Sequence, residues 1–490
     1  MDNREGVIYS NTARKEYLEE RIRYWDSVAI HAHSRIDAGA YYRKYLAEVY
    51  KGLIPPGCRV LEIGCGKGDL LDSLKPGFGM GIDISFEAIS RAKSKYPHLG
   101  FLVCDVEDLG IGSTFDYIIL SDLVNDLWDV QKVFEQIAKV SDSRTRIIIN
   151  LYSRLWEPAL LAAQRLRLCK PNIAQNWLTV EDITNLLYLV DFEVIRCWQE
   201  MLVPFDIPIV SRFANRYLVK VFPFTMCALS NIVVARQTSD AVQPMAECTV
   251  SIIVPARNEA GNIREILQRT PSMGRGTEFI FVEGHSQDDT YAVIEKTIAE
   301  FSDRQCRLLR QIGEGKADAV RIGFSHASGD VLIILDADVT VAPEDLEKFY
   351  RALVSGKAEL VNGVRHVYPM GRQAMRFLNL VVNKLFSFAF SWVIGQHIKD
   401  ILCGTKALFR KDYDRISKAC ASFGIIDPFG DFELILGSAK LNLKITDIPV
   451  RYRRRIYGKS NIRRWRHGWM LVCAFFITAI KIKFTRIQKI

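Results

Sequence analysis

Two carboxylates at the end of an apolar run are the residues in this sequence whose types and spacing point most directly to chemistry. In VLIILDADVT (331–340), five aliphatic residues lead into Asp336 and Asp338. Such a run is typical of a buried strand in a parallel sheet, and ligands of open α/β sheets bind at the carboxyl ends of these strands. The acids stand too early to cap the next helix, which we expect to begin at Pro343. Two carboxylates this close repel unless a cation joins them, so we predict a divalent-metal and diphosphate site, with a solvated turn as the alternative.

A glycine-rich turn is the second feature that could bind a ligand. Gly64, Gly66 and Gly68 follow an expected strand at Val60–Ile63 and precede an expected helix. Glycines permit a tight turn and the close approach of a ligand, and the helix N-terminus adds a positive end. The turn alone is a weak signal. It gains weight because Asp83 ends a second expected strand, where a carboxylate can accept hydrogen bonds from both hydroxyls of a ribose.

Positioning these two sites requires two α/β domains in tandem. The chain has 490 residues, of which 49% are hydrophobic and 25% charged, which suits two or three globular domains. Expected strands alternate with helical patterns in both halves, and a polar stretch containing Pro244 separates them. We therefore predict a first domain at 1–236, a linker at 237–249, a second domain at 250–460 and a tail at 461–490.

The first half resembles the class I S-adenosylmethionine-dependent methyltransferases, which have a Rossmann-like fold. The resemblance covers most of Pro55–Asn150 and depends on the order of strands, the G-x-G-x-G turn and the strand-end acids. It implies that the cofactor is S-adenosyl-L-methionine. The residues that it assigns to the cofactor are Glu62, Gly64, Gly66 and Gly68 around the methionine part, Asp83 at the ribose, and Asp105 with Val106 at the adenine. The segments 192–198 and 231–236 are expected to be the last, antiparallel strands of that fold. No dedicated base is apparent, since methyl transfer mainly requires alignment.

The second half resembles the inverting family 2 glycosyltransferases of the GT-A fold, in particular the polyprenyl-phosphate sugar synthases. The resemblance runs from about Val250 to Ser460. It implies that Asp336 and Asp338 hold Mg2+ or Mn2+ on the diphosphate of a UDP- or GDP-hexose, where the metal stabilises the leaving group. The other residues that it places at the nucleotide sugar are Pro255, Asn258, Glu259, Glu283, Lys316 and Arg365. Glu283 stands where the family usually has Asp, which leaves the preference for the base open.

Two further acids are candidates for catalysis on the acceptor side. Asp431 and Glu433, in GDFELIL, match an acceptor-side block of the glycosyltransferases. They would serve as bases if the acceptor were a hydroxyl. A polyprenyl phosphate is already ionised at neutral pH and needs no base, in which case these acids hold structure.

The basic charge of the protein lies in its C-terminal tail. Twelve lysines and arginines follow Asp447 without one acid, interleaved with tryptophans and a short apolar stretch. This pattern predicts an interfacial helix on an anionic membrane surface, whereas nucleic-acid binding is disfavoured by the apolar content. The segment Gln373–Gln396 is also apolar nearly all round, and it is either a buried helix or dimer contact in a homo-oligomer, or a lipid-facing helix. We predict no spanning helix, because the most apolar segments, Leu385–Ile394 and Trp469–Ile480, are shorter than about 20 residues.

These features together predict a bifunctional transferase. We expect a cytoplasmic enzyme, peripheral on the inner face of the membrane, that moves a hexose to a polyprenyl phosphate or related glycolipid and transfers a methyl group. Eleven scattered cysteines without a C-x-x-C pair agree with a reducing compartment, and no secretory signal is apparent at the N-terminus. One alternative keeps only the glycosyltransferase active, with the first domain as a cofactor-binding scaffold. A nucleotide-sensing adaptor is the non-enzymatic alternative.

Overall fold

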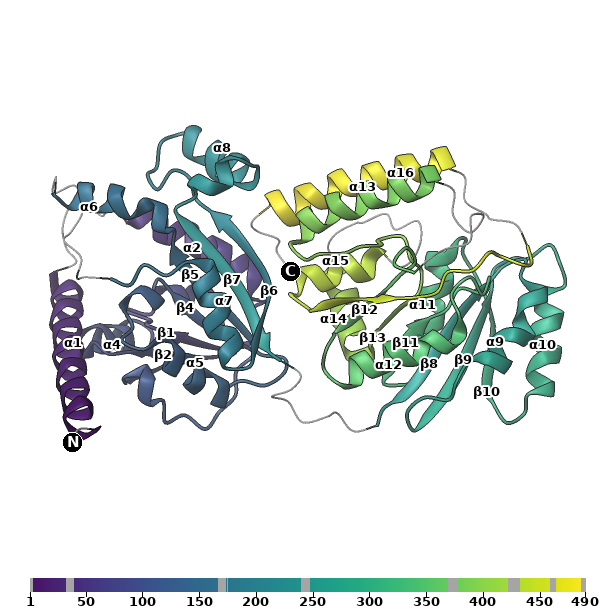
Figure 1. Cartoon of the computed structure of the whole chain (residues 1–490), viewed down its shortest axis with the longest axis horizontal. Helices are drawn as coiled ribbons and strands as arrows, with labels where there is room; N and C mark the ends of the chain where they lie inside the picture. The colour runs from purple at the N-terminus through teal and green to yellow at the C-terminus, as the bar shows by residue number, and fades with distance from the viewer. Residues whose placement is uncertain are drawn as a thin grey trace. The chain divides into compact units, whose positions relative to one another are not determined.

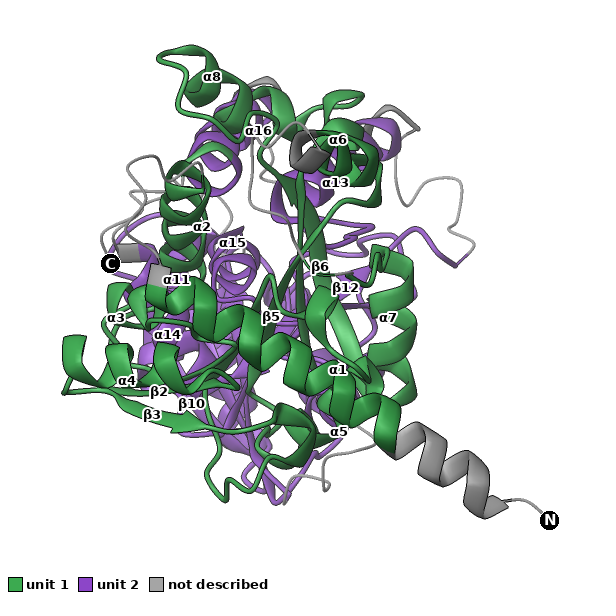
Figure 2. Ribbon diagram, turned by 90° about the vertical axis from the view of Figure 1, so that its left-hand side faces the viewer, with its two compact units in different colours: residues 1–242, 484–489 green, residues 243–483, 490 purple. Residues whose placement is uncertain are grey.

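The chain folds into two compact units, which Figure 2 distinguishes by colour. The first comprises Met1–Val242 with Phe484–Lys489, and the second Gln243–Lys483 with Ile490. This computed structural model describes residues 3–31, 39–165, 173, 175–238, 247–368, 377–421, 432–458 and 464–485. Each unit is considered by itself below.

The first unit is built on a seven-stranded mixed sheet (Figure 1). In sheet order, its strands are β3 (Gly100–Val103), β2 (Phe78–Asp83), β1 (Arg59–Ile63), β4 (Tyr117–Ser121), β5 (Arg146–Tyr152), β7 (Ser230–Gln237) and β6 (Phe192–Glu200). The first five are parallel, and β7 runs antiparallel to both β5 and β6. The carboxyl ends of β1, β2 and β4 therefore meet at one edge of the sheet, and the expected antiparallel pair at the end of this fold is confirmed.

Helices cover both faces of this sheet. The helices of the unit are α1 (Asn3–His31), α2 (Ala40–Leu53), α3 (Asp69–Ser73), α4 (Phe86–Lys95), α5 (Val130–Lys139), α6 (Glu157–Arg165), α7 (Val180–Leu189) and α8 (Val210–Arg216). One apolar core joins α2, α3 and α4 to one face, and a second core joins α5 and α7 to the other. Local signals start some of these helices, for example the Ser85 side chain that caps α4 and the capping box of Thr179 and Asp182 at α7.

The second unit has its own seven-stranded mixed sheet. In sheet order, its strands are β10 (Gln305–Arg310), β9 (Gly276–Glu283), β8 (Thr249–Ala256), β11 (Val331–Ile334), β13 (Lys406–Phe409), β12 (Leu360–Val364) and β14 (Ile445–Pro449). Strand β11 pairs in parallel with β8 and antiparallel with β13. All four of its residues are buried, as the unbroken aliphatic run predicts.

Two cores lie on the two faces of the second sheet. The helices of this unit are α9 (Ile263–Arg269), α10 (Thr290–Glu300), α11 (Lys316–His326), α12 (Leu346–Val354), α13 (Phe377–Ile394), α14 (Arg410–Ala421), α15 (Phe432–Lys440) and α16 (Arg464–Thr478). Helices α9, α10 and α12 form one core with the sheet, and α11, α13, α14 and α15 form the other. Because β11 is covered on both faces, polar side chains can be accommodated only after its carboxyl end.

Helices α13 and α16 pack side by side, as Figure 1 shows. Neither they nor any other helix in the described ranges is both long and apolar enough to cross a membrane.

The fold class inferred from the sequence is confirmed, with two α/β units in tandem and a mixed sheet in each. The predicted linker at 237–249 shares Gln237 with β7 and Thr249 with β8, and residues 239–246 lie outside the described part of the chain.

The burial of β11 gives a testable difference between two isoleucines of the second unit. Ile333 is fully buried and Ile312 is 92% exposed. Ile333→Ala should lower the free energy of unfolding by about 2–5 kcal/mol, because the removed atoms leave a cavity in the core. Ile312→Ala is the matched control and should change it by less than about 0.5 kcal/mol. Urea unfolding followed by hydrogen exchange in peptides of the second unit measures both, and equal effects would contradict the assignment of β11 to the core.

Candidate active sites

Each of the two carboxylates that follow β11 is paired with its own cation. Lys316, the first residue of α11, places its Nζ 2.5 Å from Oδ1 of Asp336. Arg455 places Nη2 2.6 Å from Oδ2 of Asp338. The other oxygen of Asp338 accepts hydrogen bonds from the backbone N–H and hydroxyl of Thr340. The repulsion expected for two carboxylates at this spacing is thus offset by side chains from α11 and from the segment after β14.

Asp336 is held in its charged form. Burial acts to raise the pKa of this carboxyl group, but the positive charge of Lys316, with smaller contributions from Arg365 and Lys406, outweighs burial and lowers the pKa below its usual value. Asp336 is therefore ionised at neutral pH.

Glu259 lies next to the same charges but behaves differently. Arg455 bridges the two acids, with Nη1 3.0 Å from Oε1 of Glu259 and Nη2 at Asp338. Burial, opposed by Arg455 and reinforced by the negative charge of Asp338, raises the pKa of Glu259 to about 7. Glu259 is therefore the acid of this site that changes its charge near neutral pH.

Gly404 approaches this site too closely for any other residue type. A Cβ atom at this position would lie 2.2 Å from Nζ of Lys316 and 2.3 Å from Oδ2 of Asp336. The sequence pattern around Gly404 matched an acceptor-side block of the glycosyltransferases, but it did not reveal this contact. The structure brings Gly404 to the carboxylates because β13 pairs directly with β11.

The remaining nucleotide-side residues lie at the ends of β8 and β9. Pro255 is within β8, and Asn258 follows it in a left-handed conformation with φ +57°. The backbone N–H of Asn258 donates to the hydroxyl of Ser286, whose own N–H donates to Oε1 of Glu283. These bonds connect the two strand ends into one polar rim. The base-binding role of Glu283 stays a prediction.

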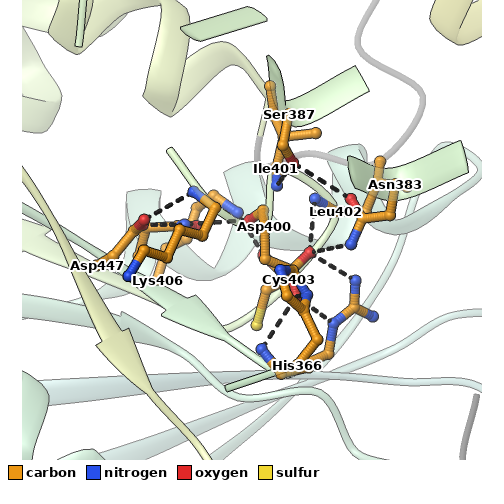
Figure 3. Close-up of polar contacts among 12 residues, drawn as sticks. His366, Asn383, Ser387, Asp400, Ile401, Leu402, Cys403, Lys406 and Asp447 are labelled. Carbon is orange, nitrogen blue, oxygen red and sulfur yellow. Dashed lines mark hydrogen bonds and ion pairs between the residues drawn. The ribbon is translucent and has the colours of Figure 1, made fainter. Parts of the chain in front are cut away.

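Arg365 is engaged by a buried partner that the sequence did not indicate. Its Nε and Nη2 lie 2.8 and 2.9 Å from the two carboxylate oxygens of Asp400, which is fully buried. Asn383 of α13 donates to Oδ1 of Asp400 at 2.7 Å (Figure 3). Burial acts to raise the pKa of Asp400, but Arg365 and Asn383 outweigh it and hold the pKa well below its usual value. The guanidinium that we expected at a phosphate is thus fixed in place by Asp400, and its role towards phosphate stays a prediction.

The two acceptor-side acids are only partly described. Asp431 lies outside the described residues. Glu433, in the first turn of α15, lies 3.9 Å from the Nε of Arg321 on α11. A residue that sequence reasoning missed is Lys406 in β13, which is fully buried, donates to the backbone carbonyl of Cys403 and acts electrostatically on Asp336. The only signal for it in the sequence was a basic residue two positions after Gly404.

In the first unit, the glycine turn is closed by Asp83. Gly64, Gly66 and Gly68 all have positive φ angles, of 72°, 51° and 76°. The two oxygens of Asp83 accept hydrogen bonds from the N–H of Gly66 and of Ser85, at 2.8 and 2.9 Å. A Cβ atom at Gly66 would meet no atom within 4 Å, so this point of the turn is open. The predicted ribose-binding acid is therefore part of the turn itself.

Glu62 carries an unsatisfied carboxylate oxygen behind this turn. The residue is 3% exposed, and among the described residues its Oε2 has no hydrogen-bond partner. Burial is the main reason that the pKa of Glu62 is raised well above its usual value. Since a buried polar atom without a partner is costly, this oxygen is a natural acceptor for a ligand N–H group.

The third strand end is covered by the N-terminal helix. Asp105 caps the short helix Val106–Asp108 through the N–H of Glu107, and its other oxygen is paired with Arg14 of α1. Val106 is buried. The contribution of Arg14 could not be anticipated, because nothing in the sequence relates it to residues about ninety positions away.

Asp122, directly after β4, is the centre of a buried polar cluster. Its backbone is left-handed, with φ +54°, and its Oδ1 accepts hydrogen bonds from the hydroxyl of Tyr42 at 2.7 Å and from Nδ2 of Asn150 at 2.6 Å. Burial, opposed by these hydrogen bonds, raises the pKa of Asp122 to about 6. The ring of Tyr152 packs 5.7 Å from that of Tyr42. Tyr42 and Tyr152 therefore belong to this cluster together with Asp122 and Asn150.

Comparison with known families agrees with both halves of this description. Residues 251–416 match the model of glycosyl transferase family 2, and residues 54–192 match that of a methyltransferase domain. The chain therefore contains one domain that matches the family 2 glycosyl transferases and one that matches a methyltransferase domain.

Curated relatives resemble the glycosyltransferase half. Glycosyltransferase AglJ of Haloferax volcanii is 29% identical over 224 residues, which are 45% of this chain and 69% of the relative. Undecaprenyl-phosphate 4-deoxy-4-formamido-L-arabinose transferase of Edwardsiella ictaluri is 26% identical over 218 residues, 43% of this chain and 62% of the relative.

Solved structures with partial similarity exist for each half. Glucosyl-3-phosphoglycerate synthase of Mycobacterium tuberculosis, solved with Mn2+ and UDP, is 19% identical, with a TM-score of 0.35 over 48% of this chain and 80% of its own. Magnesium protoporphyrin IX methyltransferase of Synechocystis is 16% identical, with a TM-score of 0.33 over 46% of this chain and all of its own.

The buried pair of Asp400 and Arg365 predicts a large loss of stability when one partner is removed. Asp400→Ala should cost about 3–5 kcal/mol, since it leaves a buried guanidinium without its counterion. Because the folded-state pKa of Asp400 is depressed, this stabilisation is complete above the unfolded pKa of about 4 and is lost as the pH falls below it. The difference in urea midpoint between the variant and the parent, measured from pH 7 down to pH 3, should therefore shrink at the acid end.

Asp414→Ala is the matched control, because Asp414 is exposed on α14. It should change the free energy of unfolding by less than about 0.5 kcal/mol. Equal costs for the two variants, or a difference that does not depend on pH, would show that the ion pair does not stabilise the unit.

Proposed function

We propose that this protein is a bifunctional, membrane-peripheral transferase. Its second unit transfers a hexose from a UDP- or GDP-sugar to a polyprenyl phosphate or related lipid acceptor, with inversion at the anomeric carbon. Its first unit transfers a methyl group from S-adenosyl-L-methionine to the sugar product or a related glycan. The observation that carries the proposal is the pair of carboxylates after β11, each held by its own ion pair, with Lys316 or with Arg455.

The carboxylate pair suits a hard divalent cation bound together with a diphosphate. Within the described ranges, no group of three or more His, Cys, Asp and Glu side chains could hold an ion without help. A site with two carboxylates leaves several positions for phosphate oxygens and water, as Mg2+ and Mn2+ prefer. When bound, the cation supplies charge stabilisation for the departing nucleoside diphosphate. Lys316 and Arg455 are placed to exchange part of their contact with the acids for contact with phosphate oxygens.

Cations near the carboxylates also favour a phosphate acceptor. Lys406, which donates to the backbone carbonyl of Cys403, acts on Asp336 in addition to Lys316. The charge of Arg365 is instead shared with Asp400. An ionised acceptor phosphate can attack without a base. Glu433 lies close to Arg321, which agrees with a structural role for this acid in that reaction.

Helix α13 supports contact with lipid, because it exposes large apolar residues while its buried side includes polar ones. Asn383 and Ser387 are buried and bind the segment that contains Asp400 and Ile401 (Figure 3). Leu385 and Phe388 are instead 64% and 79% exposed. Helix α16, which packs against α13, likewise exposes Trp469 and Phe476. Apolar residues facing outward, with a basic tail beside them, favour peripheral binding to an acidic inner membrane leaflet on the cytoplasmic side.

The transfer reaction can be tested by following the sugar. Radiolabel from UDP- or GDP-hexoses should enter an organic phase that contains polyprenyl phosphate, in the presence of Mg2+ or Mn2+. Asp336→Asn should reduce the rate by about a hundredfold or more, because it removes charge that organises the leaving group. Gly404→Ala should also reduce it, since the added Cβ would collide with Lys316 and Asp336.

Two matched variants distinguish this result from a general loss of folding. Asp303→Asn removes an exposed acid of the same unit, and Gly276→Ala adds a Cβ where no atom lies within 4 Å. Both should retain the parental rate. Label that enters the organic phase equally with Asp336→Asn would contradict the assignment of the site. Label that remains aqueous while nucleoside diphosphate accumulates would move the acceptor from lipid to a soluble glycan.

Residues of the first unit fit S-adenosyl-L-methionine. The open turn at Gly66 leaves room for a ligand, and Oε2 of Glu62 lacks a hydrogen-bond donor among the described residues. The cofactor supplies an electrophilic methyl group when bound. Asp122 is placed to accept the proton that a sugar hydroxyl loses on methylation, with Tyr42 and Asn150 fixing its orientation.

The raised pKa of Asp122 gives this half a pH signature. Below about pH 6 the carboxyl group is protonated and cannot accept a proton, so methyl transfer should rise as the pH increases through about 6. Asp122→Asn should slow transfer by about 10²–10⁴-fold and remove this rise. The assay follows the methyl label of S-adenosyl-L-methionine into the glycolipid formed by the same chain.

Glu135→Gln, at an exposed position on α5, is the control and should keep both the rate and the pH profile. Equal binding of S-adenosyl-L-methionine by the parent and by Asp122→Asn, measured by calorimetry, would show that the variant is folded. Cofactor binding without methyl transfer by the parent would favour a scaffold role for the first unit.

A further inference from the structure

The connection between β6 and β7 in the first unit is far longer than joining two antiparallel strands requires. A hairpin loop usually has two to five residues, whereas these strands are joined by residues 201–229, which include α8. We call this segment the α8 connection. Figure 1 shows α8 standing beyond the end of the β6–β7 pair. Neither the cofactor turn nor the Asp122 cluster uses a side chain of the α8 connection.

The side of the α8 connection that faces the unit buries polar residues as well as apolar ones such as Val219 and Leu229. Asn215 and Ser211 of α8 are fully buried. The side-chain oxygen of Asn215 accepts hydrogen bonds from the N–H groups of Leu202 and Val203, at 2.7 and 2.8 Å, and its backbone carbonyl accepts one from the Tyr45 hydroxyl. These polar residues hold the connection in shape and attach it to α2.

Two further contacts anchor the ends of the connection. Lys220 forms a buried ion pair with Glu200 at the end of β6. The indole N–H of Trp156 donates to the carbonyl of Cys227 at 3.0 Å. The connection therefore keeps its conformation through internal contacts and does not depend on what covers its outer side.

The outer side of the α8 connection is apolar. Ile209 and Phe222 are 81% and 76% exposed, and Phe205, Phe213 and Met226 are each more than half exposed. Single exposed apolar residues are normal, but so many within one short segment mark an interaction surface. So many large apolar side chains exposed on one side of the connection make that side suited to an apolar environment.

The charges on the outer side identify that environment. Arg212 and Arg216, one helical turn apart on α8, are exposed, and Asp206 is the only exposed acid in the connection. Large apolar and aromatic residues next to arginines are the composition of elements that lie in the interface of an anionic bilayer. We propose that the α8 connection is a membrane-binding element of the methyltransferase unit, which inserts its apolar side chains into an anionic lipid surface.

This element and the lipid contact proposed for α13 and α16 belong to different units. Phe484, after α16, does contact the α8 connection: its carbonyl accepts a hydrogen bond from Nε of Arg216, and its ring packs against that of Tyr217. The proposed insertion therefore depends on the exposed residues Ile209 and Phe222. It would bring the methyltransferase unit to the surface where a lipid-linked glycan resides. Membrane binding by the α8 connection does not require that the protein transfers a sugar. An experiment can therefore contradict this inference without contradicting the proposed sugar transfer, and the reverse also holds.

Cys227 provides a local probe, because it lies in the connection and is exposed. The full chain is labelled with an environment-sensitive nitrobenzoxadiazole thiol reagent, and the same labelling of Cys227→Ser gives the background of the other cysteines. Vesicles of phosphatidylglycerol should shift the Cys227 emission to the blue and raise it by about twofold or more, whereas phosphatidylcholine vesicles should do so weakly. Salt at 0.5 M should reduce the response by screening the arginines.

Ile209→Asp combined with Phe222→Asp should abolish the response, because it places charges where the side chains would insert. Tyr188→Asp is the matched control, since Tyr188 on α7 is 74% exposed elsewhere in the same unit, and it should leave the response intact. A chain that sediments with the vesicles but shows no change at Cys227 would overturn the proposal. Emission that is already blue-shifted without vesicles would also overturn it, because a second copy or another segment of the chain would then cover this side.

Discussion

The ion pairs Lys316–Asp336 and Arg455–Asp338 are the interactions on which the second unit is organised. Two carboxylates follow a strand that is covered on both faces, and each is paired with a cation, Asp336 with Lys316 of α11 and Asp338 with Arg455 after β14. Gly404 must lack a side chain to leave space for this arrangement. The same closeness of opposite charges lets a metal and a diphosphate replace part of each pair without creating a buried, unpaired charge.

The first unit also holds carboxylates close to its expected ligand site, but it does so without an ion pair at the glycine turn. Asp83 is held by backbone N–H groups of the glycine turn, Glu62 retains one unsatisfied oxygen, and Asp122 sits among neutral donors from Tyr42 and Asn150. Burial without a cation raises the pKa of each of these acids, whereas cations lower that of Asp336. The carboxylates of the two units therefore lie in different electrostatic environments, dominated by burial in the first unit and by cations at Asp336 in the second.

The sequence was sufficient to predict the two α/β units, the buried strand before Asp336, the glycine turn and the antiparallel end of the first sheet, because each depends on residues close together in the chain. It could not predict the partner of Arg365, since Asp400 comes from a loop 35 positions later, or the contact of Arg14 with Asp105. It also described α13 as apolar nearly all round, whereas two of its polar residues, Asn383 and Ser387, are buried together with Phe390. Tertiary contacts, and not local pattern, decide these features.

The measurement that tests the central claim most directly is a titration of Mn2+ followed by electron paramagnetic resonance, with and without UDP or GDP. We expect the parent chain to bind one ion per chain only when the nucleoside diphosphate is present, and Asp336→Asn and Asp338→Asn to weaken this binding by about tenfold or more, equivalent to about 1.4 kcal/mol. If both variants bound Mn2+ and nucleotide as tightly as the parent, the carboxylates after β11 would not be the metal and diphosphate site.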